Sequence, residues 1–172
     1  MVDVIELAAH LMALSARTAP KATGKDFIKT KVVTGDDLIR LAEDMIKYGE
    51  ETGKRNFDRD GNNVAKSGAV LLISLSNAQK VGLNCGACGY DFCNDMPDFR
   101  KGAEFDGPIC AWRLIDLGIA IGSAVKTASI LNVDNRIMYR IGVSAKRLKM
   151  IEGEIVVGIP LSATGKNIYF DR

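Results

Sequence analysis

Residues 69–75 read Ala-Val-Leu-Leu-Ile-Ser-Leu, and the rest of the chain can be organised around this stretch. Apart from Ser74, every side chain in it is apolar, so the alternation of a half-exposed strand is absent. A continuous apolar run of this length is typical of a strand that is covered on both faces of its sheet. We therefore expect residues 69–75 to form a central strand.

Strand and helix patterns alternate on both sides of this segment. Residues 28–33 alternate in polarity and stop at Gly35, which predicts a strand, and residues 154–160 predict a final one. Apolar side chains at helical spacing predict helices at residues 4–16, from an Asp36 cap to about residue 48, at 111–131, and from an Asp134 cap to residue 150. This order of elements predicts an α+β domain in which helices flank a sheet.

Composition limits the kind of protein. The chain of 172 residues is 47% hydrophobic and 26% charged, values typical of one globular domain, so we expect residues 1–172 to form a single domain. A net charge of +2 does not predict nucleic-acid binding, and the longest apolar runs are far too short to span a membrane. The chain starts without a basic segment and an apolar run, so we expect a soluble cytoplasmic protein with reduced thiols.

All the cysteines of the chain lie between residues 85 and 110. They are Cys85, Cys88, Cys93 and Cys110, spaced C-x2-C-x4-C-x16-C. Four thiolates form the complete ligand set of a tetrahedral zinc or of an iron–sulfur cluster. The spacing therefore predicts a metal centre.

Three kinds of site compete for these cysteines. Two disulfides are disfavoured because the chain is long enough to build its own core and has no export signal. Structural zinc remains open, although zinc sites usually combine two Cys or Cys/His pairs and the chain has one C-x2-C and a distant His10. An iron–sulfur cluster is favoured, since Gly86 and Gly89 allow the loop to turn its N–H groups toward the sulfurs.

The cysteine segment resembles a small domain of the iron–sulfur subunit of corrinoid methyl carriers and of the B subunit of the Rnf-type electron-transport complex. That domain runs N-C-G-x-C-G-x-x-x-C, followed by a glycine and a fourth cysteine. The matching residues are Asn84, Cys85, Gly86, Cys88, Gly89, Cys93, Gly107 and Cys110. The resemblance implies a 4Fe–4S cluster in an inserted segment, residues 83–111.

The remainder resembles the flavin nitroreductases. Residues 16–22, Ala-Arg-Thr-Ala-Pro-Lys-Ala, are similar to their A-x-x-A-P-S-A turn, and residues 116–120, Asp-Leu-Gly-Ile-Ala, are similar to the D-x-G-I-A start of their central helix. Residues 156–160 match the place of their late strand. The resemblance implies a nitroreductase-like sheet flanked by helices, and a homodimer in which the central helices pack together and flavin (FMN) binds at the seam.

The whole chain resembles a prokaryotic family described only as ferredoxin-domain proteins, through residues 134–142, 158–162 and 165–168. The arginine-rich segment that holds the flavin phosphate in nitroreductases has no counterpart before Val4. Substitute cations near flexible glycine turns are Arg17, Lys21, Lys25 and Lys166, which we expect to contact the flavin phosphate if FMN binds.

These observations predict an iron–sulfur redox protein with one 4Fe–4S cluster, and a flavin-dependent oxidoreductase if FMN binds. The alternative is a non-enzymatic electron carrier or structural module whose cysteines bind a cluster or zinc. We expect Trp112, Tyr90 and Phe92 to shield the metal, and Asp116 to pair with Arg113. No catalytic residue or electron partner is predicted.

Overall fold

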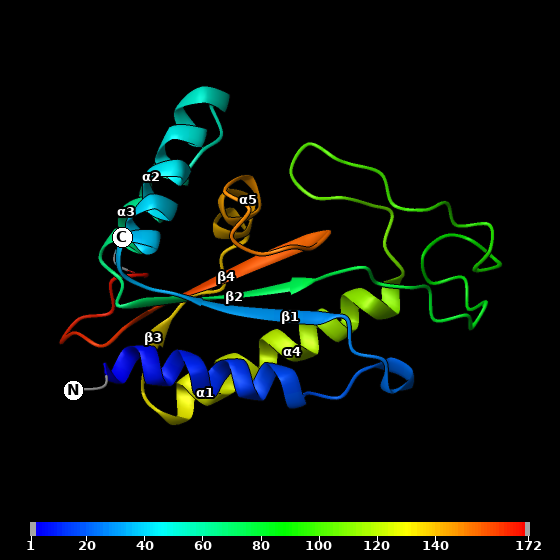
Figure 1. Cartoon of the computed structure of the whole chain (residues 1–172), viewed down its shortest axis with the longest axis horizontal. Helices are drawn as coiled ribbons and strands as arrows, with labels where there is room; N and C mark the ends of the chain where they lie inside the picture. Colours follow the sequence, from blue (N-terminus) through cyan, green and yellow to red (C-terminus); the bar gives the residue numbers. More distant parts are fainter. Residues whose placement is uncertain (1–2, 171–172) are drawn as a thin grey trace.

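The computed structural model describes residues 3–170 and contains one antiparallel sheet (Figure 1). The strand order is β1 (Ile28–Val33), β2 (Ala69–Leu75), β4 (Ile155–Ser162) and β3 (Asp134–Asn135). Every residue of β2 is buried, and β2 pairs with a neighbour on each side. The predicted central strand is therefore confirmed, together with the α+β class.

The register defines two ends of the sheet. Leu75, the last residue of β2, lies opposite Ile28 on β1 and Ile155 on β4. After Leu75 the chain leaves the sheet and forms the cysteine segment, residues 76–110. We therefore call this end of the strands the site end. At the opposite end Ala69 pairs with Leu161 on β4.

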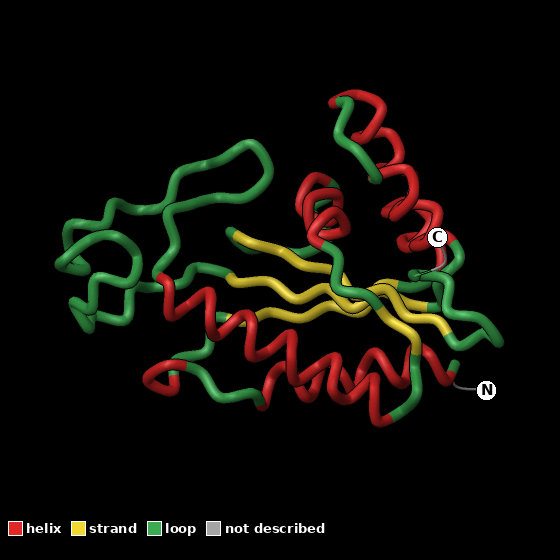
Figure 2. The backbone as a smooth tube through the Cα atoms, turned by 180° about the vertical axis from the view of Figure 1, so that it is seen from behind, coloured by secondary structure: helices red, strands yellow, loops and turns green. Residues whose placement is uncertain are grey.

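Two helical layers cover the sheet (Figure 2). One face carries α1 (Val4–Thr18) and α4 (Ala111–Ile130), and the other carries α2 (Gly35–Thr52), α3 (Phe57–Ala65) and α5 (Tyr139–Arg147). Because side chains alternate along a strand, β2 contributes Leu71, Ile73 and Leu75 to the first core and Val70 and Leu72 to the second. This double burial explains why the pattern of β2 is continuously apolar.

Acidic residues have different roles at the starts of the first two long helices. The Asp3 carboxylate accepts hydrogen bonds from the N–H groups of Ile5 and Glu6, at 2.8 and 3.2 Å, and so begins α1. Thr34, not Asp36, is the N-cap of α2. Asp36 lies in the first turn instead, where its negative charge is favoured by the helix dipole.

The predicted helix from Asp134 to residue 150 is wrong in its first part. Asp134 pairs with Ser162 in the short strand β3, and its side chain accepts a hydrogen bond from Asn167 at 2.9 Å. Helix α5 starts only at Tyr139, after Met138 bridges to Gly158. Strand pairing with β4 takes up the backbone groups that a helix would have used.

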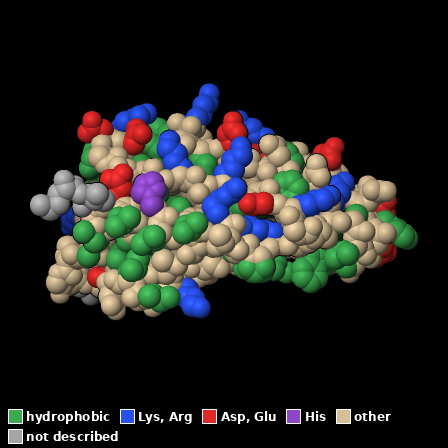
Figure 3. All heavy atoms as spheres, turned by 60° about the horizontal axis from the view of Figure 1, so that its bottom comes forward, with side chains coloured by type: hydrophobic (Ala, Val, Ile, Leu, Met, Phe, Trp, Pro, Cys, Tyr) green, Lys and Arg blue, Asp and Glu red, His purple; other side chains and the backbone are tan. Residues whose placement is uncertain are grey.

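Hydrophobic side chains gather on the outer surface of α1 and α4 (Figure 3). Large hydrophobic side chains are exposed along both helices; they include Leu7, Leu11, Leu14, Ile115, Ile119 and Ile130. We call these six residues the apolar face. None of the helices within residues 3–170 combines the length and apolar character that crossing a bilayer requires.

Candidate metal centre

Residues 76–110 connect β2 to α4 without forming a helix or strand, and they extend beyond the site end of the sheet (Figure 1). Buried Glu154, just before β4, anchors both limbs of this segment. Its carboxylate accepts the N–H of Asn77 at 3.0 Å, and its carbonyl accepts the N–H of Asp106 at 3.0 Å. The segment is thus attached at its base while its tip lies in solvent.

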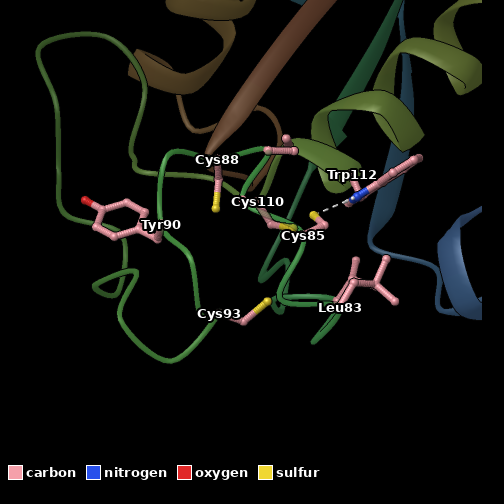
Figure 4. A pocket seen from close by; sticks show the side chains of 11 residues that line it. Leu83, Cys85, Cys88, Tyr90, Cys93, Cys110 and Trp112 are labelled. Carbon is pink, nitrogen blue, oxygen red and sulfur yellow. Dashed lines mark hydrogen bonds between the residues drawn. The ribbon is translucent and has the colours of Figure 1, made fainter.

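The structure brings the four cysteines together in the lining of one small cavity. Cys85, Cys88 and Cys93 lie on the loop, whereas Cys110 is buried at the N-cap of α4. Figure 4 shows the four thiol groups directed toward the space between them. A helix terminus and a loop therefore supply the sulfurs together.

The donor set of this cavity consists of thiols alone. The other lining residues are Val81, Leu83, Gly86, Ala87, Tyr90, Ala111 and Trp112, which offer no carboxylate or imidazole. Across residues 3–170, no three Cys, His, Asp or Glu side chains are grouped as ligands of a single metal ion. Chemically, an all-thiol set fits an iron–sulfur cluster or a zinc ion with four cysteine ligands.

Hydrogen bonds organise the thiols. The Asn84 N–H donates to the Cys93 sulfur at 3.3 Å, and the Asn84 side-chain oxygen accepts the N–H of Cys93 at 2.8 Å. The Trp112 indole N–H donates to the Cys85 sulfur at 3.2 Å (Figure 4). The sequence singles out Asn84 only as part of a motif, and this pair of contacts gives the residue a physical role.

Two glycines give the loop its turn. Gly86 and Gly89 have φ angles of 72° and 86°, and the N–H of Gly89 donates to the Gly86 carbonyl at 2.9 Å. The backbone N–H of Ala87 donates to Cys85 and is the main cause of a lowered pKa of that thiol; the Trp112 hydrogen bond lowers the pKa further. These two hydrogen bonds therefore favour the thiolate form of Cys85, which is the form that binds a metal.

The aromatic side chains of the segment have different positions. Trp112 and Tyr90 both line the cavity. Phe92 is 60% exposed and does not line it, so the expectation that Phe92 shields a metal is wrong. Asp91 and Asn94 beside it are exposed as well, so little of the loop covers the ring.

The cations expected to hold a flavin phosphate are in two separate places. Lys21 is only 6% exposed in its side chain, and its ammonium donates to the carbonyls of Ala16 and Arg17, so it caps the end of α1. Arg17 pairs with Asp26 at 3.1 Å, and Lys25 is exposed nearby. These three cations lie near the start of β1, at the site end.

Lys166 follows β4 and therefore lies beyond the opposite end of the sheet from Lys25. The strand β2 separates these ends, and its length is roughly 20 Å at about 3.3 Å per residue. Within one chain, Lys166 and the Arg17–Lys25 loop cannot contact the same phosphate. Arg113 and Asp116, in contrast, form the expected pair at 2.9 Å, and both are buried.

Comparisons with known proteins agree with this architecture. Residues 106–172 match the family described as "Uncharacterized protein containing a ferredoxin domain (DUF2148)". A protein of Archaeoglobus fulgidus, described as "Uncharacterized protein", is 50% identical over 169 residues, which cover 98% of this chain and 91% of that protein. The chain belongs to this ferredoxin-domain family. The resemblance to ferredoxin-domain proteins that we noted in residues 134–168 is thereby confirmed.

Solved structures of nitroreductases share the fold of this ferredoxin-domain protein. Nitroreductase CinD from Lactococcus lactis in complex with 4-nitrophenol has a TM-score of 0.61 at 14% identity, with 99% of this chain and 86% of that chain covered. The FMN-dependent nitroreductase NfnB from Mycobacterium smegmatis in complex with NADPH also has a TM-score of 0.61, at 12% identity, with 95% and 80% covered. At these identities the likeness shows the nitroreductase-like fold alone.

Proposed function

We propose that Cys85, Cys88, Cys93 and Cys110 hold one 4Fe–4S cluster, which makes this protein an iron–sulfur redox protein. The observation that carries the proposal is the shared cavity, where four thiols meet N–H groups that already donate to sulfur. Four cysteines complete the ligand set of such a cluster. The ferredoxin description of the family supports the same assignment.

The spacing of the cysteines along the sequence favours a cluster over zinc, because zinc sites usually combine two Cys or Cys/His pairs. Four thiolates on one zinc each lie about 2.3 Å from the ion and so must converge tightly. On a cubane each thiolate binds a different iron, so the sulfurs stand farther apart. The single C-x2-C pair of this chain, with its other two cysteines farther along the sequence, therefore fits the cluster better.

When bound, such a cluster supplies a one-electron redox centre. Ligation by cysteine alone leaves no iron open to substrate, so the site is suited to electron transfer. Cys110 would hold the cluster from the start of helix α4, and Cys85 would hold it from the exposed side of the loop. The N–H donors of Trp112 and Asn84 stabilise negative charge on the sulfurs, which favours the reduced state.

Anaerobic purification with metal analysis tests this proposal. We expect a brown protein with about four iron and four sulfide per chain. Zinc at one per chain without acid-labile sulfide, even after anaerobic reconstitution, would overturn it in favour of a structural zinc site with four thiolate ligands.

We propose FMN as a second cofactor, at which a substrate would react. Several solved neighbours of the same fold are described as containing FMN, including a nitroreductase from Desulfitobacterium hafniense. Because Lys166 and the Arg17–Lys25 loop lie at opposite ends of one chain, a phosphate contacted by both requires two chains. The test is to bleach the iron–sulfur chromophore, denature the protein and look for released flavin. We expect yellow flavin in the supernatant. If no flavin is released, the function that remains is that of an electron carrier.

We also propose that the protein is a cytoplasmic homodimer. The apolar face on α1 and α4 is the support, because exposed hydrophobic side chains in such number mark a surface that is covered by another molecule. Gly118 and Gly122 are exposed on the same helix, and an added Cβ at either would meet no neighbouring atom. Small residues there would let a second α4 approach closely.

A further inference from the structure

One buried cation lies at the base of the cysteine segment. Arg113, on the first turns of α4, is 1% exposed. Its guanidinium donates to the Gln79 carbonyl at 2.8 Å, the Ala22 carbonyl at 3.0 Å and the Asp116 carboxylate at 2.9 Å. Three segments that are distant in sequence therefore meet at one side chain.

Asp116 completes this joint. One carboxylate oxygen accepts the Arg113 hydrogen bond, and the other accepts the N–H of Ala22 at 2.7 Å. Ala22 is consequently held at both its N–H and its carbonyl by the pair. The ring of Phe27 lies 4.7 Å from the guanidinium carbon and covers the cation from another side.

The joint is directly connected to the candidate metal centre. The Arg113 backbone N–H donates to the carbonyl of Cys110 at 2.9 Å. Gln79 lies on the other limb of the segment, between β2 and Cys85. Arg113 therefore contacts the chain that enters the cysteine loop as well as the ligand residue at which the loop ends.

A neutral apolar pair could fill the same space, because a buried ion pair adds little to stability compared with hydrophobic residues of similar size. What an apolar pair could not supply is charge. Charges in a buried site act on each other far more strongly than charges in water. A cation one turn from Cys110, balanced by Asp116, is therefore placed to influence any redox centre bound by that cysteine.

We propose that Arg113 is a positioning residue for the cluster, and that its charge, balanced by Asp116, sets the reduction potential of the centre. The proposal rests on the cluster assignment made above. It has two separable parts: the guanidinium holds Gln79 and Ala22 against the first turn of α4, which follows Cys110, and the charge balance of the pair controls how readily the centre takes up an electron.

The charge is tested with Asp116→Asn in the protein that contains the cluster. The amide can still accept the Ala22 N–H, but the positive charge of Arg113 is no longer balanced, so the reduced state is favoured. We expect the midpoint potential to shift to a more positive value in a spectroscopic redox titration. The matched control is Asp37→Asn, which removes a carboxylate from an exposed pair with Arg40 of the same i,i+3 spacing on α2. A potential that moves no more in Asp116→Asn than in this control would overturn the electrostatic part.

The positioning is tested with Arg113→Lys, which keeps the charge and loses the fork of hydrogen bonds. We expect amide hydrogen exchange around Ala22 and Gln79 to become faster by about tenfold, while the potential stays near that of the unmodified protein. Exchange as slow as in the unmodified protein would overturn the joint. Hydrogen exchange can be measured with or without bound metal. A protein that contains no iron and sulfide would therefore contradict the cluster assignment, and the exchange measurement would still test whether Arg113 holds Ala22 and Gln79.

Discussion

At the scale of single residues, hydrogen bonds to sulfur are the features that give the candidate metal centre its properties. Trp112 and Asn84 donate to Cys85 and Cys93 from different directions, one from helix α4 and one from the loop itself. Donors of this kind stabilise the state with more negative charge on the sulfurs. The two donors are therefore expected to raise the reduction potential of a bound cluster.

Replacing Trp112 by Phe removes the indole N–H and keeps an aromatic ring in place. We expect the midpoint potential to become more negative, because the reduced state loses a hydrogen bond to the Cys85 sulfur. The midpoint potential is measured by redox titration. Phe92→Leu is the control variant, because it removes an exposed ring that does not line the cavity. An equal or higher potential in Trp112→Phe would contradict the role given to the indole.

At the scale of elements, the sequence predicts the parts whose pattern follows from local burial. The strands β1 and β2 have the predicted bounds, and α4 begins at the predicted residue, because their apolar spacing directly reflects which faces are covered. For the charged and glycine-containing residues 50–66 the sequence pattern allows a short helix without fixing one, and helix α3 forms there because Phe57 and Val64 pack into the second core. The strand β3 depends on pairing with β4, which no local pattern encodes.

In the candidate site, too, the sequence predicts some features and leaves others to the three-dimensional structure. The sequence identifies the four cysteines by spacing, but it gives no sign that Lys21 is used to cap α1 or that Lys166 lies beyond the far end of the sheet. Those facts depend on the sheet register and on tertiary contacts. Asn84 belongs to a recognisable motif, yet its paired hydrogen bonds to Cys93 become visible only in three dimensions.

The helix α5 packs against strand β4 through a glycine. A Cβ added at Gly142 would lie 1.7 Å from the carbonyl oxygen of Val156, so strand and helix would have to move apart. We expect Gly142→Ala to lower the free energy of unfolding by about 1–3 kcal/mol or more, measured by chemical denaturation. Gly165→Ala is the control, because nothing lies within 4 Å of its added Cβ. Equal stability of the two variants would contradict this close contact.

The cysteine segment is expected to depend on the metal more than the sheet does. Its residues 76–110 contain no helix or strand, whereas both hydrophobic cores are built almost entirely outside it. We expect Cys88→Ser to lose the cluster and to show fast hydrogen exchange within the segment, while thermal unfolding stays cooperative. A variant that is wholly unfolded by circular dichroism would show that the metal centre is part of the main fold.

At the scale of the whole molecule, the two layers of helices differ in how they meet solvent. The layer of α1 and α4 carries the apolar face, and α4 also carries Cys110, so an interface on this layer would be connected directly to the metal centre. A twofold contact between identical faces is the commonest way to cover such a surface. An obligate dimer of this kind buries more than about 2,000 Å².

The dimer is best tested by placing a charge in the apolar face. Ile119 is 39% exposed on α4, and Ile119→Asp would bury a carboxylate without a partner if a second chain covers this face. We expect the variant to sediment as a monomer at micromolar concentration while the unmodified protein sediments as a dimer. The control is Ile39→Asp, at a side chain of similar exposure, 44%, on α2 in the other layer, which should leave the dimer intact. If the unmodified protein were itself a monomer, Lys166 and the Arg17–Lys25 loop could not share one phosphate. The electron carrier would then be the better description of this protein.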